Sequence, residues 1–175
     1  MTYTASRFDN KKLESLIHSV SQGDRDALAQ LYRSTGPVVY AYAYSILKNT
    51  QDAEDVLHDC FVTLWDSAGS YRSMGKPMAW IMTITRNHCL MLKRKNNRVI
   101  PLDPADIPVH ISDDPQDRIM LRQIMNILST EERQIVFLHA VAGCKFRQIA
   151  QTLDKKTATV LSIYYRAIRK LRGSL

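Results

Sequence analysis

The sequence predicts an all-α protein with two small helical domains joined by an acidic extended linker, the second domain containing a helix-turn-helix. Apolar residues recur at helical spacing along most of the chain, and helix-capping residues stand where these segments begin. Only Val38 to Tyr44 alternates like a strand, and with no partner strand we interpret it as helix. A run with four prolines and five aspartates, 99–117, separates the two helical parts.

Charge points to a polyanionic partner. The net charge is +7, divided into +4 over residues 1–98, −5 over 99–117 and +8 over 118–175. Two basic segments on an acidic tether indicate two modules that face nucleic acid. The longest near-apolar run, Pro37 to Leu47, is too short to cross a membrane, and no signal sequence opens the chain. We therefore expect a cytoplasmic protein without membrane insertion.

The sequence lacks the spacings of metal sites and catalytic centres. Cys60, Cys89 and Cys144 are scattered and odd in number, which predicts reduced, mostly buried thiols. The five histidines do not pair at ligand spacing, and neither a glycine-rich phosphate loop nor a nucleophile motif is found. We expect no metal, no cofactor, no small-molecule substrate and no enzymatic activity.

Capping residues place the first two helices. Asp9 can begin a helix that Gly23 ends, and Asp24 or Asp26 can begin the next. The apolar stripe predicted for the first helix consists of Leu13, Leu16, Ile17 and Val20.

The stretch from Asn49 to Trp65 predicts a helix with one buried side and one acidic side. Its buried stripe consists of Ala53, Val56, Leu57, Cys60, Phe61 and Leu64. Asp59 and Asp66 lie too far from the helix start to gain from its dipole, so the acidic side is a candidate docking surface for a basic protein. A solvated face over a core stripe is the alternative interpretation.

A loop rich in Gly, Ser and Pro, 69–77, precedes another predicted helix with a basic end. The inner face of that helix is predicted to consist of Trp80, Ile81, Ile84, His88, Met91 and Leu92. Thr83, Asn87 and Arg94 form a polar row beside it, which suits a nucleic acid strand. A surface helix with a solubilising basic end explains the same pattern.

The C-terminal part carries the signals of a helix-turn-helix. Residues 129–132, STEE, form a capping box before a helix that Gly143 can end. FRQIAQTL (146–153), a four-residue turn and a longer helix from Ala158 to Arg172 follow. Ala150 is small where two helices must cross closely, as in a helix-turn-helix, although any short helical hairpin can mimic this pattern.

Together these segments resemble sigma factors, the promoter-specificity subunits of bacterial RNA polymerase, of the small extracytoplasmic-function type. DAEDVLHDCFVTLW (52–65) resembles their polymerase-binding helix, and AWIMTITRN (79–87) resembles the helix that melts and reads the minus-ten element. TATVLSIYYRAIRKL (157–171) resembles the helix that reads the minus-thirty-five element. The resemblance implies a polymerase-binding and minus-ten domain at 1–98, a linker at 99–117 and a minus-thirty-five domain at 118–175.

The resemblance also implies three sets of contact residues. Those expected to bind polymerase are Asp52, Glu54, Asp55, His58, Asp59, Phe61 and Trp65. Those expected at the minus-ten element are Ser73, Met74, Lys76, Trp80, Thr83, Arg86, Asn87, Lys93 and Arg94. Those expected at the minus-thirty-five element are Lys155, Lys156, Thr159, Ser162, Tyr165, Arg166, Arg169 and Lys170.

The second domain departs from the family pattern. Asp154 and Lys155 occupy a turn that usually holds glycine and an apolar residue, and Leu161 and Ile163 stand in place of a lysine and an arginine. We therefore expect this domain to bind duplex DNA weakly and with little sequence preference. The partners implied are core RNA polymerase, promoter DNA and an anti-sigma protein.

Two other functions remain open from the sequence alone. A conventional dimeric helix-turn-helix regulator would bind symmetrical half-sites, but it does not account for the first domain. A polymerase-binding adaptor with a degenerate DNA-binding module would fit the departures in the second.

Overall fold

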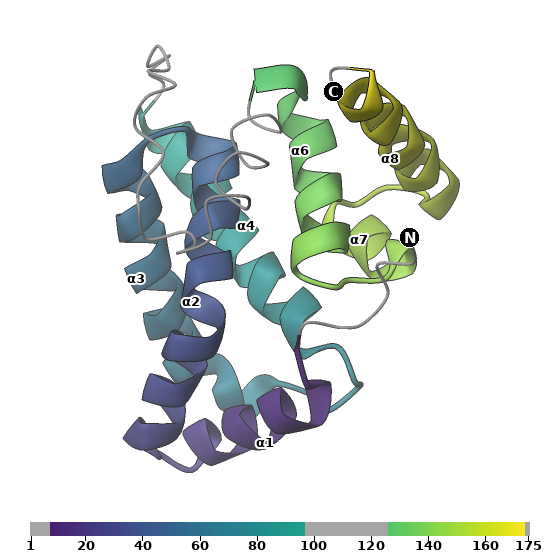
Figure 1. Ribbon diagram of the computed structural model, residues 1–175. Helices are drawn as coiled ribbons and strands as arrows, with labels where there is room; N and C mark the ends of the chain where they lie inside the picture. Colours follow the sequence, from purple (N-terminus) through teal and green to yellow (C-terminus); the bar gives the residue numbers. More distant parts are fainter. Residues whose placement is uncertain (1–7, 97–125, 174–175) are drawn as a thin grey trace.

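The computed structural model describes residues 8–96 and 126–173, and this part of the chain is helical without strands (Figure 1). The first helical group consists of α1 (Asn10–Ser21), α2 (Arg25–Leu47), α3 (Thr50–Ser67), the short 3₁₀ turn η1 (Ala68–Ser70) and α4 (Pro77–Asn96). The second helical group consists of α6 (Thr130–Val136), the π-helical η3 (Phe137–Val141), α7 (Phe146–Thr152) and α8 (Thr157–Arg172). The predicted all-α class is confirmed. The predicted linker 99–117 lies outside the described residues.

Helix starts follow the predicted caps. The Asp9 carboxylate accepts hydrogen bonds from the backbone N–H groups of Lys11 and Lys12 at the start of α1, and Asp24 caps α2 in the same way. In α6 the Ser129 and Glu132 side chains form the predicted capping box. These side chains satisfy N–H groups that have no partner within their own helix.

The alternating Val38–Tyr44 segment belongs to α2, which runs through Pro37 as one continuous helix. Every residue from Val38 to Ile46 is buried. Both helical groups pack against α2, and a helix that is covered on all sides is apolar around its whole circumference. This explains why the sequence of α2 shows no clear helical stripe.

The inner face predicted for α4 is correct only in part: Ile81 is buried, and Trp80, Ile84 and Leu92 are half-buried against the core. The helix buries Met78, Ile81, Met82, Thr85 and Cys89, whereas Met91 is 62% exposed. Thr85 can lie in the core because its hydroxyl donates to the Ile81 carbonyl oxygen at 2.9 Å and lies 3.3 Å from the Cys60 sulfur. The prediction had assigned the face from apolar residues, and a threonine that bonds to its own helix shifts that face.

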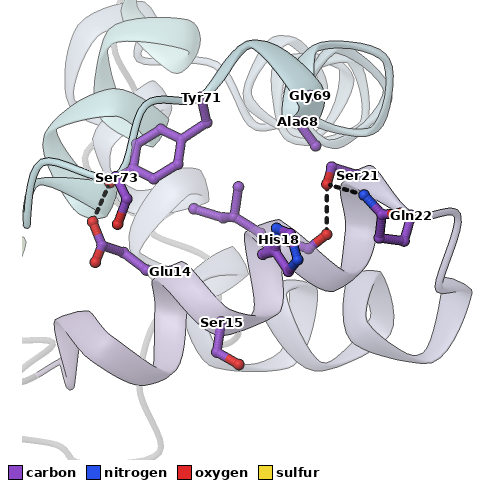
Figure 2. A pocket seen from close by; sticks show the side chains of 10 residues that line it. Glu14, Ser15, His18, Ser21, Gln22, Ala68, Gly69, Tyr71 and Ser73 are labelled. Carbon is purple, nitrogen blue, oxygen red and sulfur yellow. Dashed lines mark hydrogen bonds between the residues drawn. The ribbon is translucent and has the colours of Figure 1, made fainter.

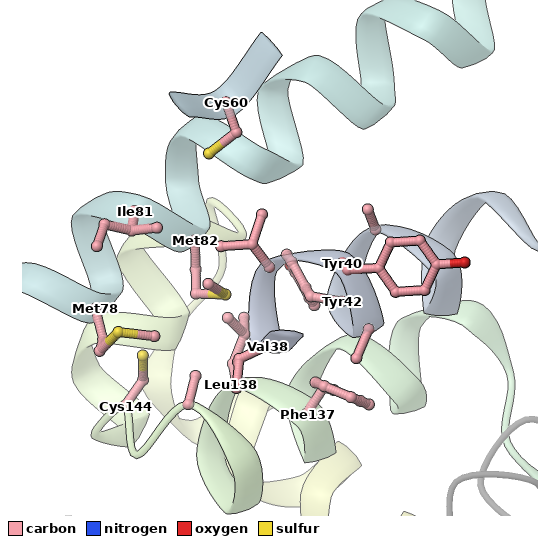
Figure 3. Packing of buried hydrophobic residues seen from close by; sticks show 14 of the residues in the cluster. Val38, Tyr40, Tyr42, Cys60, Met78, Ile81, Met82, Phe137, Leu138 and Cys144 are labelled. Atoms are coloured by element: carbon pink, nitrogen blue, oxygen red, sulfur yellow. The ribbon is translucent and has the colours of Figure 1, made fainter. Parts of the chain in front are cut away.

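One apolar core extends from the first helical group into the second (Figure 3). Val38 and Met78 from α2 and α4 belong to the same cluster as Phe137, Leu138 and Cys144 from the second group. Ile135, Leu138 and Ala142 of the second group are all buried as well. The two groups therefore pack on each other in this structure.

A buried arginine joins the groups at the carboxyl end of α2. Arg133 of α6 is only 2% exposed, and its Nε–H donates to the Ser45 carbonyl oxygen at 3.0 Å. Its two terminal nitrogens donate to the Leu128 carbonyl oxygen and to Thr130 Oγ1. The Ser45 carbonyl is among the last four of α2, which lack partners within the helix, and a cation is favoured at this negative end.

Replacing Arg133 by alanine removes the donor that Ser45 and Leu128 share. We expect the free energy of unfolding to fall by about 1–3 kcal/mol, the usual cost of leaving buried polar groups unsatisfied. Urea titration followed by circular dichroism measures the change. Arg147→Ala, which removes an exposed arginine of α7, is the matched control, and equal transition midpoints for the two variants would contradict the assigned role.

Candidate functional site

Four aspartates lie along one side of α3, which we call the acidic edge: Asp52, Asp55, Asp59 and Asp66. Asp52 is half-buried and the other three are exposed to solvent. The edge borders an open groove of about 660 Å³ between α3 and α4. Met91, Arg94 and Lys95 line the other wall of this groove, so acidic and basic side chains face each other across it.

Residues beside the acidic edge differ in exposure. Glu54 and His58 are exposed, Trp65 is half-buried, and Val62 adds an apolar side chain that is 48% exposed. Phe61 is only 5% exposed and packs against Tyr32 with ring centroids 4.9 Å apart. The Phe61 ring therefore lies beneath this surface in the free protein, and its contact with polymerase stays a prediction.

The loop of residues 71–76 connects η1 to α4 and presents polar and apolar groups to solvent. Ser73 is exposed, Met74 is 65% exposed and Lys76 is half-buried. Trp80, in the first turn of α4, packs on Tyr71 with ring centroids 4.9 Å apart. The loop and the start of α4 thus form one surface, which contains four of the predicted minus-ten residues.

The remaining predicted minus-ten residues fall into two groups. Asn87, Lys93 and Arg94 are exposed on α4. Thr83 and Arg86 instead contact the second helical group. The Thr83 hydroxyl and the Arg86 Nε–H are therefore engaged in this arrangement.

The contacts of Thr83 and Arg86 involve Thr152 and Gln134 of the second helical group, and Gln134 is also bonded to Tyr42 of α2. The Thr83 hydroxyl lies 3.1 Å from the Thr152 hydroxyl of α7. Gln134 of α6 accepts hydrogen bonds at one oxygen from Arg86 Nε and from the Tyr42 hydroxyl. Sequence analysis missed Gln134 and Thr152, since neither belongs to a motif or an apolar stripe.

His88 occupies the position expected for a core-edge histidine. It is half-buried, and its Nε2 lies 2.8 Å from the Thr63 hydroxyl of α3. The predicted satisfied histidine is confirmed.

The exposed side of α8 carries most of the predicted minus-thirty-five residues. Exposed side chains there and at its N-cap are Lys156, Thr159, Ser162, Tyr165, Arg166 and Arg169. The two other lysines form ion pairs inside the second group, Lys155 with Glu131 at 2.6 Å and Lys170 with Glu132 at 2.7 Å. Pairing with glutamates reduces the positive field that these lysines offer to phosphates.

Two departures in this region have structural explanations. Ile163 is 7% exposed and lies in the shared core, which corrects the interpretation that it replaces a DNA-contacting cation. Asp154 adopts φ +51° in the turn between α7 and α8. This is the left-handed region, where glycine is usual and aspartate is tolerated better than most residues.

The cysteines are buried and unpaired, as predicted. Burial raises the pKa of Cys60 to about 11 and that of Cys144 to about 12, so both thiols stay protonated at neutral pH. Within the ranges 8–96 and 126–173, acidic, histidine and cysteine side chains form no group suited to a metal ion. None of the helices in these ranges is long and apolar enough to span a bilayer.

Comparison with known proteins identifies the family. Residues 31–99 match the family model described as Sigma-70 region 2, and residues 118–171 match Sigma-70, region 4. An ECF RNA polymerase sigma factor SigK from Mycobacterium sp. (strain KMS) is 28% identical over 179 residues, covering 96% of this chain and 93% of the relative. The SigK of Mycobacterium ulcerans (strain Agy99) is 24% identical over 188 residues, covering 100% and 98%.

The chain is an extracytoplasmic-function sigma factor. Sigma factors are non-catalytic subunits that direct RNA polymerase to promoters. The region 2 match runs from Leu31 in α2 through α4, and the region 4 match takes in α6, α7 and α8.

Solved structures share the fold of this sigma factor. CnrH, in complex with the cytosolic domain of CnrY, has a TM-score of 0.68 and 22% identity, covering 93% of this chain and 96% of that chain. The sigma factor RpoE, in complex with the anti-sigma factor NepR from Bartonella quintana, has a TM-score of 0.64 and 24% identity, covering 83% and 94%.

Proposed function

We propose that this sigma factor binds core RNA polymerase through the acidic edge of α3. The proposal is supported by exposed acids in an otherwise basic protein, next to the exposed Val62 and the half-buried Trp65. Acidic side chains around an apolar patch suit a basic protein surface, because opposite charges steer association and burial of the patch stabilises it.

The minus-ten element is assigned to loop 71–76 and α4. The observation that carries this assignment is their common exposed surface: Ser73 and Met74 on the loop, and Asn87, Lys93 and Arg94 along the helix. Cations can bind phosphates of an opened strand while amide and aromatic groups contact an unstacked base. The proposed domains are a polymerase-binding and minus-ten domain at 1–98, a linker at 99–117 and a minus-thirty-five domain at 118–175.

Promoter binding on this assignment requires the two helical groups to separate. Thr83 and Arg86 belong to the proposed minus-ten surface, yet both are half-buried, with Thr83 in contact with Thr152 of α7 and Arg86 hydrogen-bonded to Gln134 of α6. The closed arrangement is therefore a resting form, and promoter DNA binds an open form.

The second helical group contributes less to specificity. Arg169 is the best candidate to bind a guanine edge, and exposed Arg166 and Lys156 are available to phosphates. The pairing of Lys155 and Lys170 with glutamates supports the expectation of weak binding to the minus-thirty-five element.

An anti-sigma protein is a further proposed partner. Proteins of similar fold have been solved with a partner chain, which for RpoE is an anti-sigma factor. An anti-sigma protein that binds the closed arrangement better than the open one would shift the population toward the closed arrangement. We place the protein in the cytoplasm, because its function requires access to polymerase and the chromosome.

Reversing two charges tests the polymerase-binding surface. Asp55→Lys combined with Asp59→Lys should weaken binding to core polymerase by more than about tenfold, because lysines would face a basic partner. Titration with labelled sigma factor measures the affinity, and circular dichroism checks that helix content is unchanged. Asp26→Lys, at an exposed acid in the first turn of α2, is the control. Wild-type affinity of the double variant would exclude this surface.

Cross-linking the two groups tests the requirement for opening. The Thr83 and Thr152 hydroxyls are 3.1 Å apart, so Thr83→Cys with Thr152→Cys should form a disulfide on mild oxidation. We expect the oxidised protein to lose promoter-dependent transcription with core polymerase and a library of genomic fragments, and reduction to restore it. The three native thiols are buried and protonated, so we expect them not to form disulfides under these conditions.

The single variant Thr83→Cys, oxidised in the same way, controls for loss of the hydroxyl. Full transcription by protein shown to be completely cross-linked would mean that the closed arrangement binds promoters.

A further inference from the structure

We propose that Glu14 of α1 is a positioning residue that holds loop 71–76 in the shape required to take up an unstacked promoter base. The inference rests on the proposed function of that loop, and it adds α1 to the parts of the protein on which base capture depends. Glu14 does not contact DNA in this proposal and acts through the loop.

The carboxylate of Glu14 joins both ends of the loop. Figure 2 shows Glu14 and Tyr71 facing each other between α1 and the loop. The Glu14 Oε1 accepts a hydrogen bond from the Tyr71 hydroxyl at 2.9 Å and another from the backbone N–H of Gly75 at 2.8 Å. Asn10, one helical turn earlier, donates a longer bond of 3.4 Å to the Gly75 carbonyl oxygen. A helix more than 50 residues away in sequence thereby fixes where the loop begins and where it turns into α4.

The other contacts of the loop involve the same two side chains, since Glu14 also interacts with Ser73 and Met74, and Tyr71 with the backbone of Met74 and Lys76. The loop's backbone bonds in the described part of the chain lie at its edges, from Tyr71 N–H to the Ala68 oxygen and from Trp80 N–H to the Lys76 oxygen. Gly75 takes φ +67°, and glycine adopts many backbone conformations readily. Its backbone therefore needs an outside contact to hold it in this one. An open hollow of about 610 Å³, lined in part by Glu14, Tyr71 and Ser73, lies between α1 and the loop, so packing does not support this side.

Electrostatics keep the contact intact at neutral pH. Burial acts to raise the pKa of Glu14, but hydrogen bonds from Tyr71 and Gly75 outweigh it, and the pKa lies below its usual range. Burial and the neighbouring carboxylate raise the pKa of Tyr71 to about 12, so its hydroxyl remains a donor. The Tyr71 ring packs on Trp80. By fixing Tyr71, Glu14 therefore also positions Trp80 in the first turn of α4.

The test couples Glu14 to the captured base, using full-length protein in complex with core polymerase. Promoter fragments are first selected from genomic DNA with the wild-type complex, then prepared as pre-melted duplexes with an abasic site at each minus-ten position in turn. We expect one abasic position to weaken wild-type binding strongly. Glu14→Ala should weaken binding to the intact duplex about tenfold, and should cause no further loss at that abasic position.

Three variants separate positioning from a general loss of structure. Glu14→Gln keeps an oxygen at the accepting position and should restore most of the affinity. Tyr71→Phe removes one donor while retaining the ring, and should give part of the loss without adding to that of Glu14→Ala. Ser15→Ala, at an exposed neighbour that lines the same hollow, should bind like wild type. Thermal unfolding and affinity for core polymerase should be unchanged in all of them.

Two results would overturn the inference. An equal loss for Glu14→Ala on intact and abasic DNA, or no loss on either, would show that Glu14 does not act through the captured base. Wild-type binding that is indifferent to every abasic position would instead remove base capture, and with it both the proposed minus-ten function of the loop and this inference.

Discussion

The shared apolar core, with the Arg133 guanidinium buried against the carboxyl end of α2, holds the two helical groups in the closed arrangement. A buried charge is stable only when its donors are satisfied, and carbonyl oxygens from both helical groups supply two of its partners. Separation of the groups would expose this guanidinium to water, and the Ser45 carbonyl with it. Because water can satisfy both, the polar contact opposes separation less strongly than the apolar core around it.

That core sets what the protein can bind at rest. Met78 and Val38 meet residues of η3, which brings α6 and α7 over the face of α4 that carries Thr83 and Arg86. The acidic edge of α3 stays exposed in the same arrangement. On the proposed assignment of these surfaces, a protein in this state engages polymerase before it engages DNA, and the order of events follows from which helices share a core.

Local chemistry explains why part of the fold was predictable from the sequence. Asp9 and the Ser129–Glu132 box act within one helical turn, and the stripe containing Val56 and Leu64 follows the helical period. The inner face of α4 was predicted correctly only in part, since Thr85 satisfies its own hydroxyl in the core while the apolar Met91 faces solvent. Periodicity detects apolar residues and does not register a hydroxyl that bonds to its own helix.

The tertiary contacts were beyond sequence reasoning for a different reason. Glu14 meets Gly75, and Gln134 meets Arg86, only after distant segments pack together, and neither Glu14 nor Gln134 belongs to a motif. The candidate surfaces themselves were found through resemblance to a family, which assigns roles to positions. It does not say which of those positions the closed arrangement covers.

The central claim is that the free protein rests with its helical groups closed and opens on the promoter. Labels on Gln30→Cys in α2 and Arg147→Cys in α7, both exposed positions, allow the distance between the groups to be measured by double electron–electron resonance. The account predicts one short, narrow distance distribution for the free protein, and a longer one in complex with core polymerase and promoter DNA. The same short distance in the promoter complex would contradict it.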